Sequence, residues 1–393
     1  MLMRPTASPA SAARPGGNMR KSADPVCGYT MYGRETSFYT SKLRTYLVRK
    51  GIPFTEKSPN MWFNNVTIPR HIGVVATPVL ISSNGEWLFD TKAIIDRFEV
   101  EYPTVRLIPD TPVQTVAALL FEMWVDEMWI PTALAVRWCH MEENYPFLEK
   151  DVVGALLPGW PRWLQRRAGH IMSKRMLDLL PQTGVTPEQE DLLHRWTVQQ
   201  LDWLEAHFAT TPFVLGQRPT IADVAFNGPL YAHFSRDPWP GEHLINPRPS
   251  LKAWIKTMNR PGEILGELEP GDQFPPTLEP MMSSLLRDLL VYLDGNLAEL
   301  QKAVEARPAG GTIDRFLGEI TIPMLDGHFR RRSMPFVLWM LQRIQDKVGA
   351  MPDQDRAKVV VWLGSYGAER LLDLKVPRLK RDGLNIALDR QGQ

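Results

Sequence analysis

Hydrophobic and polar positions follow two different periods in the first hundred residues. Short apolar runs bounded by Gly or Pro predict four strands, and "SNG" joins the last two in a hairpin. Apolar side chains at helical spacing predict a helix over residues 38–50, ended by Gly51 and Pro53, and a second helix that starts at Asp90. The order is therefore βαβ followed by ββα, a small α/β domain with helices packed on a mixed sheet. The four runs are "VCGYTMYG", "IPFTEKSP", "VVATPVLIS" and "EWLF", with "NMWFNNVTIPRHIG" as an irregular or short helical connection before the third.

Beyond residue 105 the chain changes to long segments of helical period with almost no strand signal. They predict an all-helical domain over residues 106–268, which the Gly- and Pro-rich stretch "LGELEPGDQFPPTLEP" brings to an end. Three more helical segments predict a helical extension over residues 269–393. These segments are "TLEPMMSSLLRDLLVYLDGNLAELQKAVEA", "SMPFVLWMLQRIQDKVGAM" and "DQDRAKVVVWLGSYGAERLL". The α/β domain then occupies residues 25–105, after a tail over residues 1–24.

That tail is rich in Pro, Ser, Ala, Gly and Arg, and its first 23 residues contain no acid. An organelle transit peptide has a similar composition, but the prolines oppose the amphipathic helix that such a peptide needs. We therefore expect residues 1–24 to be a disordered tail, or Met1 to be an upstream start codon with Met19 as the functional start.

Charge and cysteine content narrow the function classes. The chain has 45 Lys and Arg against 44 Asp and Glu, so its net charge of +1 favours neither nucleic acid nor an anionic membrane as a partner. No apolar run approaches the roughly 20 residues that span a bilayer. Cys27 and Cys139 lie far apart without a CxxC partner, which fits a reducing, cytoplasmic compartment. "WCHMEEN" lacks the spacing of a metal site, and the basic stretches "FRRRS" and "VPRLKRDG" are interpreted as solvated faces.

Four short motifs, in order and at suitable spacing, resemble those of the cytosolic glutathione S-transferases. They are "SFYTSKLR", "ATPVL", "FDTKAI" and "LGQRPTIADV". The resemblance covers residues 28 to about 265 and implies a thioredoxin-like N-terminal domain, an all-helical C-terminal domain and glutathione as co-substrate, with no metal. A homodimer is left open. The long C-terminal extension resembles that of a bacterial subset of the superfamily.

The first motif carries the chemistry. A hydroxyl at a helix N-terminus lies where backbone N–H groups and the helix dipole favour an anion, and a hydrogen bond there stabilises a thiolate. The resemblance implies that Ser37 is this donor, with Thr40 and Tyr32 as alternatives. The alternative is that Ser37 is only the helix N-cap, which would contribute about 1 kcal/mol to stability. Phe38 stands where the family usually has Pro.

Two further motifs imply the glutathione site. In the family the bond at Thr77-Pro78 is cis and the residue before Pro pairs with the peptide backbone of glutathione. Asp90 and Thr91, where the family usually has Glu-Ser, are expected to hold the γ-glutamyl group, the acid binding the ammonium and the hydroxyl the carboxylate. Asp90 alone would also be a good N-cap.

The remaining candidates concern structure and the second substrate. Thr220 and Asp223 have capping-box spacing, so we expect substitution of Asp223 to reduce stability before catalysis. Trp124, Met128 and Trp129 suit a pocket for a hydrophobic electrophile, although such a stripe at helical spacing is more often core.

The sequence therefore predicts an enzyme that adds the glutathione thiolate to a hydrophobic electrophile, as in detoxification. One alternative is glutathione-dependent lyase or reductase chemistry, including ether cleavage or dehalogenation. The other is a non-catalytic binding or scaffold protein that kept the fold, suggested by Phe38, Asp90 and the extension.

Overall fold

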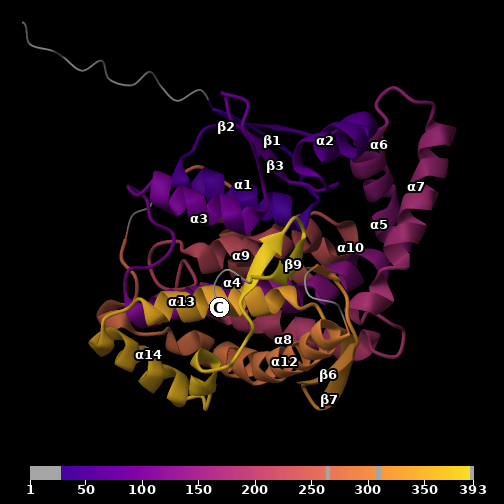
Figure 1. Ribbon diagram of the computed structural model, residues 1–393. Coiled ribbons are helices and arrows are strands. Elements are labelled where there is room, and N and C mark those ends of the chain that lie inside the picture. Colours follow the sequence, from indigo (N-terminus) through magenta and orange to yellow (C-terminus); the bar gives the residue numbers. More distant parts are fainter. Residues whose placement is uncertain (1–27, 263–265, 307–310, 390–393) are drawn as a thin grey trace, which may run out of the picture.

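The computed structural model describes residues 28–262, 266–306 and 311–389. The predicted tail, Met19 and Cys27 lie outside these residues. The described chain forms an N-terminal α/β unit, a central helical domain and an extension that covers one side of both (Figure 1).

The α/β unit has the predicted βαβ-ββα order. Its four strands are β1 (Tyr29–Tyr32), β2 (Phe54–Lys57), β3 (Val79–Ile81) and β4 (Trp87–Phe89), in the spatial order β2-β1-β3-β4. β1 and β2 are parallel and the other pairs antiparallel. Helices α1 (Phe38–Lys50) and α3 (Thr91–Glu101) lie between the sheet and the helical domain (Figure 1), while a π-helical turn (Phe63–Thr67) and α2 (Ile68–Ile72) form the connection before β3. This is the predicted thioredoxin-like domain.

The central domain is helical, as predicted, and is built around α4 (Pro112–Trp138). That helix is buried over most of its length and packs against α9 (Ile221–Pro229). On its other side α9 packs against α1. The other helices are α5 (Met141–Leu148), α6 (Gly154–Leu156), α7 (Arg162–Leu177), α8 (Glu190–Phe208), α10 (Pro238–Pro240) and α11 (Pro249–Met258). Short π and 3-10 turns at Glu149–Val153, Leu180–Thr183, Leu230–Ser235 and Gly241–Ile245 join them.

The extension contains the three predicted helices and also strands that the sequence analysis did not predict. The helices are α12 (Glu279–Glu305), α13 (Phe336–Gly349) and α14 (Asp353–Gly364). Between and after them lie β5 (Thr312–Ile313), the hairpin β6 (Glu319–Met324) and β7 (Gly327–Arg332), and the hairpin β8 (Leu379–Asp382) and β9 (Asn385–Leu388), with 3-10 turns at Pro270–Asp272, Pro276–Leu278 and Glu369–Leu372. The extension is thus mixed rather than purely helical.

The β6–β7 hairpin shows why the strands were missed. Buried and exposed residues alternate along β6, which is the period of a half-buried strand. On β7 the alternating buried positions are Phe329 and Arg331, and an Arg at an inward position hides the pattern. Arg331 is 1% exposed, stacks 5.0 Å over the Tyr292 ring and donates to the carbonyl of Glu127 at 2.9 Å. The interpretation of "FRRRS" as a solvated face is therefore wrong for Arg331, while Arg330 beside it is exposed.

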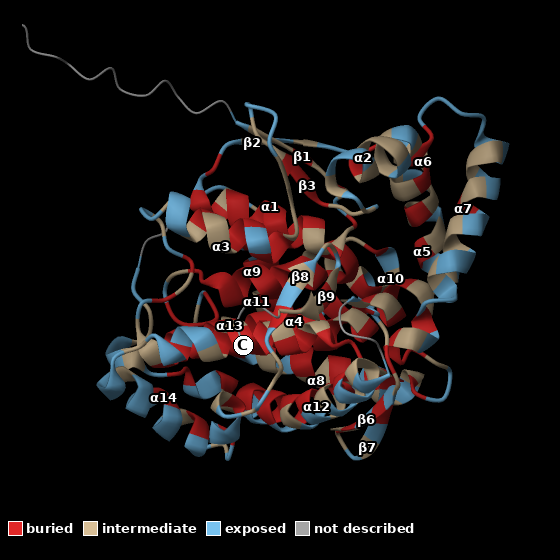
Figure 2. Ribbon diagram, viewed as in Figure 1, coloured by how far each residue is buried: buried red, intermediate tan, exposed pale blue. Residues whose placement is uncertain are grey.

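One hydrophobic core runs through all three parts, from Met31 on β1 to Ile386 on β9 (Figure 2). The extension also reaches the core through charge. Arg343 on α13 pairs with Glu122 on α4 at 3.3 Å and with Asp96 on α3. The extension is therefore packed into the same interior as the two domains that precede it.

Candidate functional site

Two adjoining cavities meet at the start of α1. The first, here called the α3 cavity, has a volume of about 520 Å³ and lies against Thr77, Pro78 and the start of α3. The second, the α7 cavity, has a volume of about 470 Å³ and lies between the start of α1, the end of α4 and α7. Both cavities share five lining residues, Tyr39, Thr77, Met176, Arg315 and Met334. The two spaces thus form one candidate site with two compartments.

Ser37 lines the α7 cavity and caps α1. Its Oγ accepts a hydrogen bond from the backbone N–H of Thr40 at 3.4 Å, so the hydroxyl proton remains available for a second acceptor. The loop before it is fixed from the helical domain. Arg137, buried and paired with Asp237 at 2.6 Å, donates to the carbonyl of Thr36 at 2.8 Å. Ser37 is therefore held in place by a buried arginine on α4.

The two alternative donors are placed elsewhere. Thr40 is fully buried, and its side chain packs so closely on Gly33 that a Cβ there would lie 2.4 Å from it. Tyr32 stacks on Phe63 with ring centroids 4.0 Å apart. Neither residue lines either cavity, so the structure brings Ser37 alone of these three to the site. Tyr39, which the sequence analysis did not single out, lines both.

Phe38 accounts for the departure from the family's Pro. Its ring is 7% exposed and lies over Gly228 of α9, where a Cβ would come within 2.8 Å of the ring. The large side chain and the glycine together let α1 and α9 approach closely. Phe38 therefore serves the contact between the two domains.

The second and third motifs meet at the α3 cavity. The Thr77-Pro78 bond is cis, as the resemblance implied, and both residues line the cavity. Asp90 is the N-cap of α3, with φ of 66°, and its carboxylate accepts from the backbone N–H of Ala93 at 3.0 Å. Thr91, mostly buried, follows it in the cavity wall. The structure therefore brings together all four residues predicted for glutathione.

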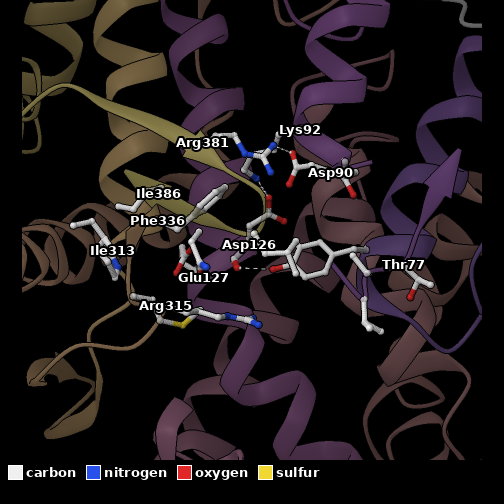
Figure 3. A pocket seen from close by; sticks show the side chains of 18 of the residues that line it. Thr77, Asp90, Lys92, Asp126, Glu127, Ile313, Arg315, Phe336, Arg381 and Ile386 are labelled. Atoms are coloured by element: carbon white, nitrogen blue, oxygen red, sulfur yellow. Dashed lines mark hydrogen bonds and ion pairs between the residues drawn. The ribbon is translucent and has the colours of Figure 1, made fainter. Parts of the chain in front are cut away.

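Asp90 already has a cationic partner. Arg381, on β8 of the extension, points toward Asp90 and forms an ion pair with it (Figure 3). The guanidinium is held over the rings of Phe336 and Trp339, 5.6 and 5.4 Å from their centroids. Arg381 comes from "VPRLKRDG", which the sequence analysis interpreted as a solvated face. That interpretation is wrong for Arg381, whose side chain is only 16% exposed.

The Lys of "SFYTSKLR" belongs to a buried ionic cluster, two members of which, Lys92 and Asp126, also line the α3 cavity. Lys42 Nζ lies 2.8 Å from Glu122 Oε1 and 2.6 Å from Asp126 Oδ2, and Lys92 also pairs with Asp126. Burial, with the nearby charge of Lys42, lowers the pKa of Lys92 well below its usual value. Burial opposes ionisation of Glu122, but Lys42, Lys92 and Arg343 hold its pKa below the usual range. We assign this cluster to stability because it joins α1, α3, α4 and α13.

Glu127 adds a buried carboxyl to the wall of the α3 cavity. It lines this cavity and accepts a hydrogen bond from the Tyr292 hydroxyl at 3.1 Å. Burial raises its pKa, against the opposing effect of Arg331. Nothing in the sequence indicated its position, because Tyr292 and Arg331 both belong to the extension.

The three residues predicted for the electrophile pocket lie in the core. Trp124, Met128 and Trp129 are fully buried, and the two indoles pack on Trp196 and Phe226. None lines either cavity. The apolar wall of the α7 cavity comes instead from neighbouring residues on α4 and from the α5–α7 region: Ile130, Leu134, Leu148, Val152, Val153, Met172, Met176 and Leu179.

The predicted capping box is present at the start of α9. The Asp223 carboxylate accepts from the backbone N–H of Thr220 at 2.8 Å, and also from the Val214 N–H at 2.9 Å and the Trp254 indole at 3.2 Å. All of this is buried. Asp223 therefore joins three segments of the helical domain, away from the cavities.

Comparison with known proteins identifies the helical domain. Residues 197–257 match the family model described as the glutathione S-transferase C-terminal domain. The helical domain is similar to the C-terminal domain of the glutathione S-transferases. This match and the thioredoxin-like unit that precedes it support the predicted resemblance to the glutathione S-transferase superfamily. No curated protein matches the chain.

Solved structures of glutathione S-transferases and of a beta-etherase are similar over about two thirds of this chain. One from Rhodospirillum rubrum F11 is 17% identical, with 63% of this chain and 96% of that chain covered and a TM-score of 0.38. A beta-etherase from Sphingobium sp. strain SYK-6 is 15% identical, with 65% and 98% covered and a TM-score of 0.40. A third, from Methylobacterium radiotolerans in complex with glutathione sulfonate, is 20% identical, with 61% and 98% covered and a TM-score of 0.35.

Two further findings concern metal ions and membranes. Residues 28–262, 266–306 and 311–389 contain no group of three or more His, Cys, Asp or Glu arranged to hold a metal ion. No helix in this part of the chain is both long and apolar enough to cross a bilayer.

Proposed function

We propose that this protein, as a member of the glutathione S-transferase superfamily, transfers glutathione to a hydrophobic electrophile at the junction of the two cavities. The observation that carries the proposal is the position of Ser37. Ser37 lines the mainly apolar α7 cavity, and Thr77, which lines the same cavity, also lines the α3 cavity with the other residues expected to hold glutathione. Sulfur and electrophile would then meet beside a hydrogen-bond donor.

The chemistry needs a stabilised thiolate. Glutathione's thiol loses its proton to solvent, and the Ser37 hydroxyl donates a hydrogen bond to the sulfur, favouring the anion near neutral pH. The sulfur then forms a bond to the electrophilic carbon, and the leaving group departs with the bonding electrons. Ether cleavage and dehalogenation follow the same course with a different leaving group, so the substrate decides between them.

The test is glutathione binding by calorimetry, followed by conjugation of 1-chloro-2,4-dinitrobenzene by the full chain. A hydrogen bond to a charged group is worth about 1.5–3 kcal/mol, so Ser37→Ala is expected to lower kcat/KM roughly ten- to hundredfold. Ser173→Ala is the matched control, because Ser173 lines the same cavity without capping α1. Unchanged activity of Ser37→Ala would move the donor role, with Tyr39 as the next residue to substitute.

The ion pair between Arg381 and Asp90 supports a second candidate, a binding protein without transferase activity. The Arg381 guanidinium is paired with the Asp90 carboxylate, which is the group expected to bind the γ-glutamyl ammonium of glutathione. In a transferase with this site, the γ-glutamyl ammonium of glutathione must replace the Arg381 guanidinium at Asp90. We therefore expect Arg381→Ala to bind glutathione roughly two- to tenfold more tightly than the wild type, because glutathione no longer has to displace the Arg381 guanidinium from Asp90.

The two candidates give different results in the same titration. Binding by both proteins, tighter in Arg381→Ala, supports the transferase. Binding by Arg381→Ala alone shows that the extension closes the site, which favours the second candidate. Failure of both to bind at millimolar glutathione contradicts glutathione as the ligand.

A further inference from the structure

A basic and apolar surface on α7 lies outside the site described above. Exposed aromatic and aliphatic side chains gather there: Trp160 is 52% exposed, Trp163 66% and Ile171 53%. Across from them, on the connection before α2, Trp62 is 66% exposed. Figure 2 shows α7 at the edge of the molecule, in tan and pale blue along nearly its whole length.

Between these segments runs an apolar groove of about 690 Å³. Its walls come from the α2 connection and from the α6–α7 region, and they are almost entirely apolar. The lining residues include Met61, Val66, Leu156, Leu157, Leu164 and Ile171. Large exposed apolar patches of this kind are rare on a free surface and mark interaction sites.

The charge around the groove is one-sided. Residues 152–177, which lie between Asp151 and Asp178, contain five Lys or Arg and no acid, and residues 58–71 contain Arg70 and no acid. The whole chain is nearly balanced, so this is a local concentration. Within the part of the chain that the structure describes, Arg166 is the only one of these five cations with a carboxylate within 4 Å, that of Glu149 at 3.4 Å. The surface therefore matches a partner that is both negatively charged and apolar.

We propose that α7, with the 58–71 segment beside it, docks on an anionic lipid bilayer. A helix rich in Lys and Arg with Trp and aliphatic side chains among them is typical of a surface that lies in the bilayer interface. The indoles of Trp62, Trp160 and Trp163 would lie at the level of the headgroups, and the basic side chains against the phosphates. This surface was not predicted from the sequence, because only the net charge was weighed there.

Two other partners fit less well. A second copy of the chain would place the same cationic helix against itself, and like charges across an interface are strongly unfavourable. Single-stranded nucleic acid could stack on the Trp rings and pair with the cations, but it has no aliphatic group that would fill the groove. A lipid acyl chain would fill it.

The test is co-sedimentation of the full chain with vesicles. We expect binding to phosphatidylcholine vesicles with 30% phosphatidylserine and none to phosphatidylcholine alone, and binding should weaken with salt. Replacing Arg162, Arg166, Arg167 and Lys174 with Gln should weaken binding more than a hundredfold, because each basic residue near such a surface is worth roughly fivefold. The matched control replaces four exposed lysines outside the surface with Gln: Lys252, Lys256, Lys347 and Lys358.

A second variant tests the apolar part. Trp160→Ser with Trp163→Ser keeps every charge and should weaken vesicle binding at least tenfold; thermal unfolding of each variant checks that it remains folded. Equal binding by the Arg/Lys variant and its control would overturn the proposal. So would wild-type binding to an oligonucleotide but not to vesicles, or association into dimers that the same substitutions abolish. None of these readouts depends on glutathione or on activity.

Discussion

Lys42 gives the sharpest test of how the α/β unit is fixed to the rest of the molecule. Its side chain is fully buried, and its ammonium lies between Glu122 and Asp126. Lys42→Met keeps the volume and removes the charge. Two buried carboxylates then depend on Lys92 and Arg343, and burial already disfavours the charged form of Lys92. Removing one partner of a buried pair costs about 3–5 kcal/mol, and we expect a loss of stability in this range.

Urea unfolding of the full chain, followed by tryptophan fluorescence, measures this loss. The indoles of Trp124 and Trp129 lie in the core and report on its integrity. Lys256→Met, at an exposed position on α11, is the control and should change the unfolding free energy by less than about 0.5 kcal/mol. Combining Lys42→Met with Glu122→Gln should cost less than the sum of the single changes, because the second removes a charge that the first left unpaired. A loss below about 1 kcal/mol for Lys42→Met, or strictly additive losses, would refute the reasoning.

Three further changes test other contacts. Asp223→Ala removes the acceptor for three buried donors and should cost about 3 kcal/mol in urea unfolding, with kcat of the remaining folded protein unchanged; a fall in kcat at full stability would contradict its structural role. Burial lowers the pKa of His207 to about 4, so as the pH falls from 7 to 5 the unfolded chain binds a proton there before the folded chain does, and stability falls. His207→Gln should reduce that loss of stability by about 2 kcal/mol. An equal loss in both proteins would contradict this reasoning. Gly228→Ala should cost about 1–3 kcal/mol in thermal unfolding through overlap with Phe38, and Phe38→Leu should restore part of it; absence of rescue would show that the overlap is not the cause.

Signals confined to a few neighbouring residues made most of the fold predictable. The strands and helices of the α/β unit follow from period and from Gly and Pro, and the capping box follows from the spacing of Thr220 and Asp223. The same local signals could not decide whether a buried side chain lies in the core or lines a cavity. Trp124 and Trp129 have the same helical spacing in a core as in a pocket wall, and only the position of α8 and α9 around them settles it.

Contacts between distant parts of the chain were the ones that sequence reasoning missed. Arg381 and Asp90 lie in different domains, and neither has a neighbour in sequence that indicates the other. Arg331 occupies an inward position of a strand because Tyr292 and the Glu127 carbonyl accept its charge there. An arginine is normally counted as exposed, so the period of β7 was hidden by the residue that completes its buried face.

The position of Arg343 bears on how such a chain can be shortened or inherited. Because this side chain on α13 completes the charge around Glu122 in the middle of the helical domain, a premature stop codon before α13 would not simply remove an accessory module. The truncated product would keep the acid and lose one of its cations, together with the cover over α4. Glu122 would then depend on Lys42 and Lys92 alone, so the length of this chain and the identity of that acid are coupled.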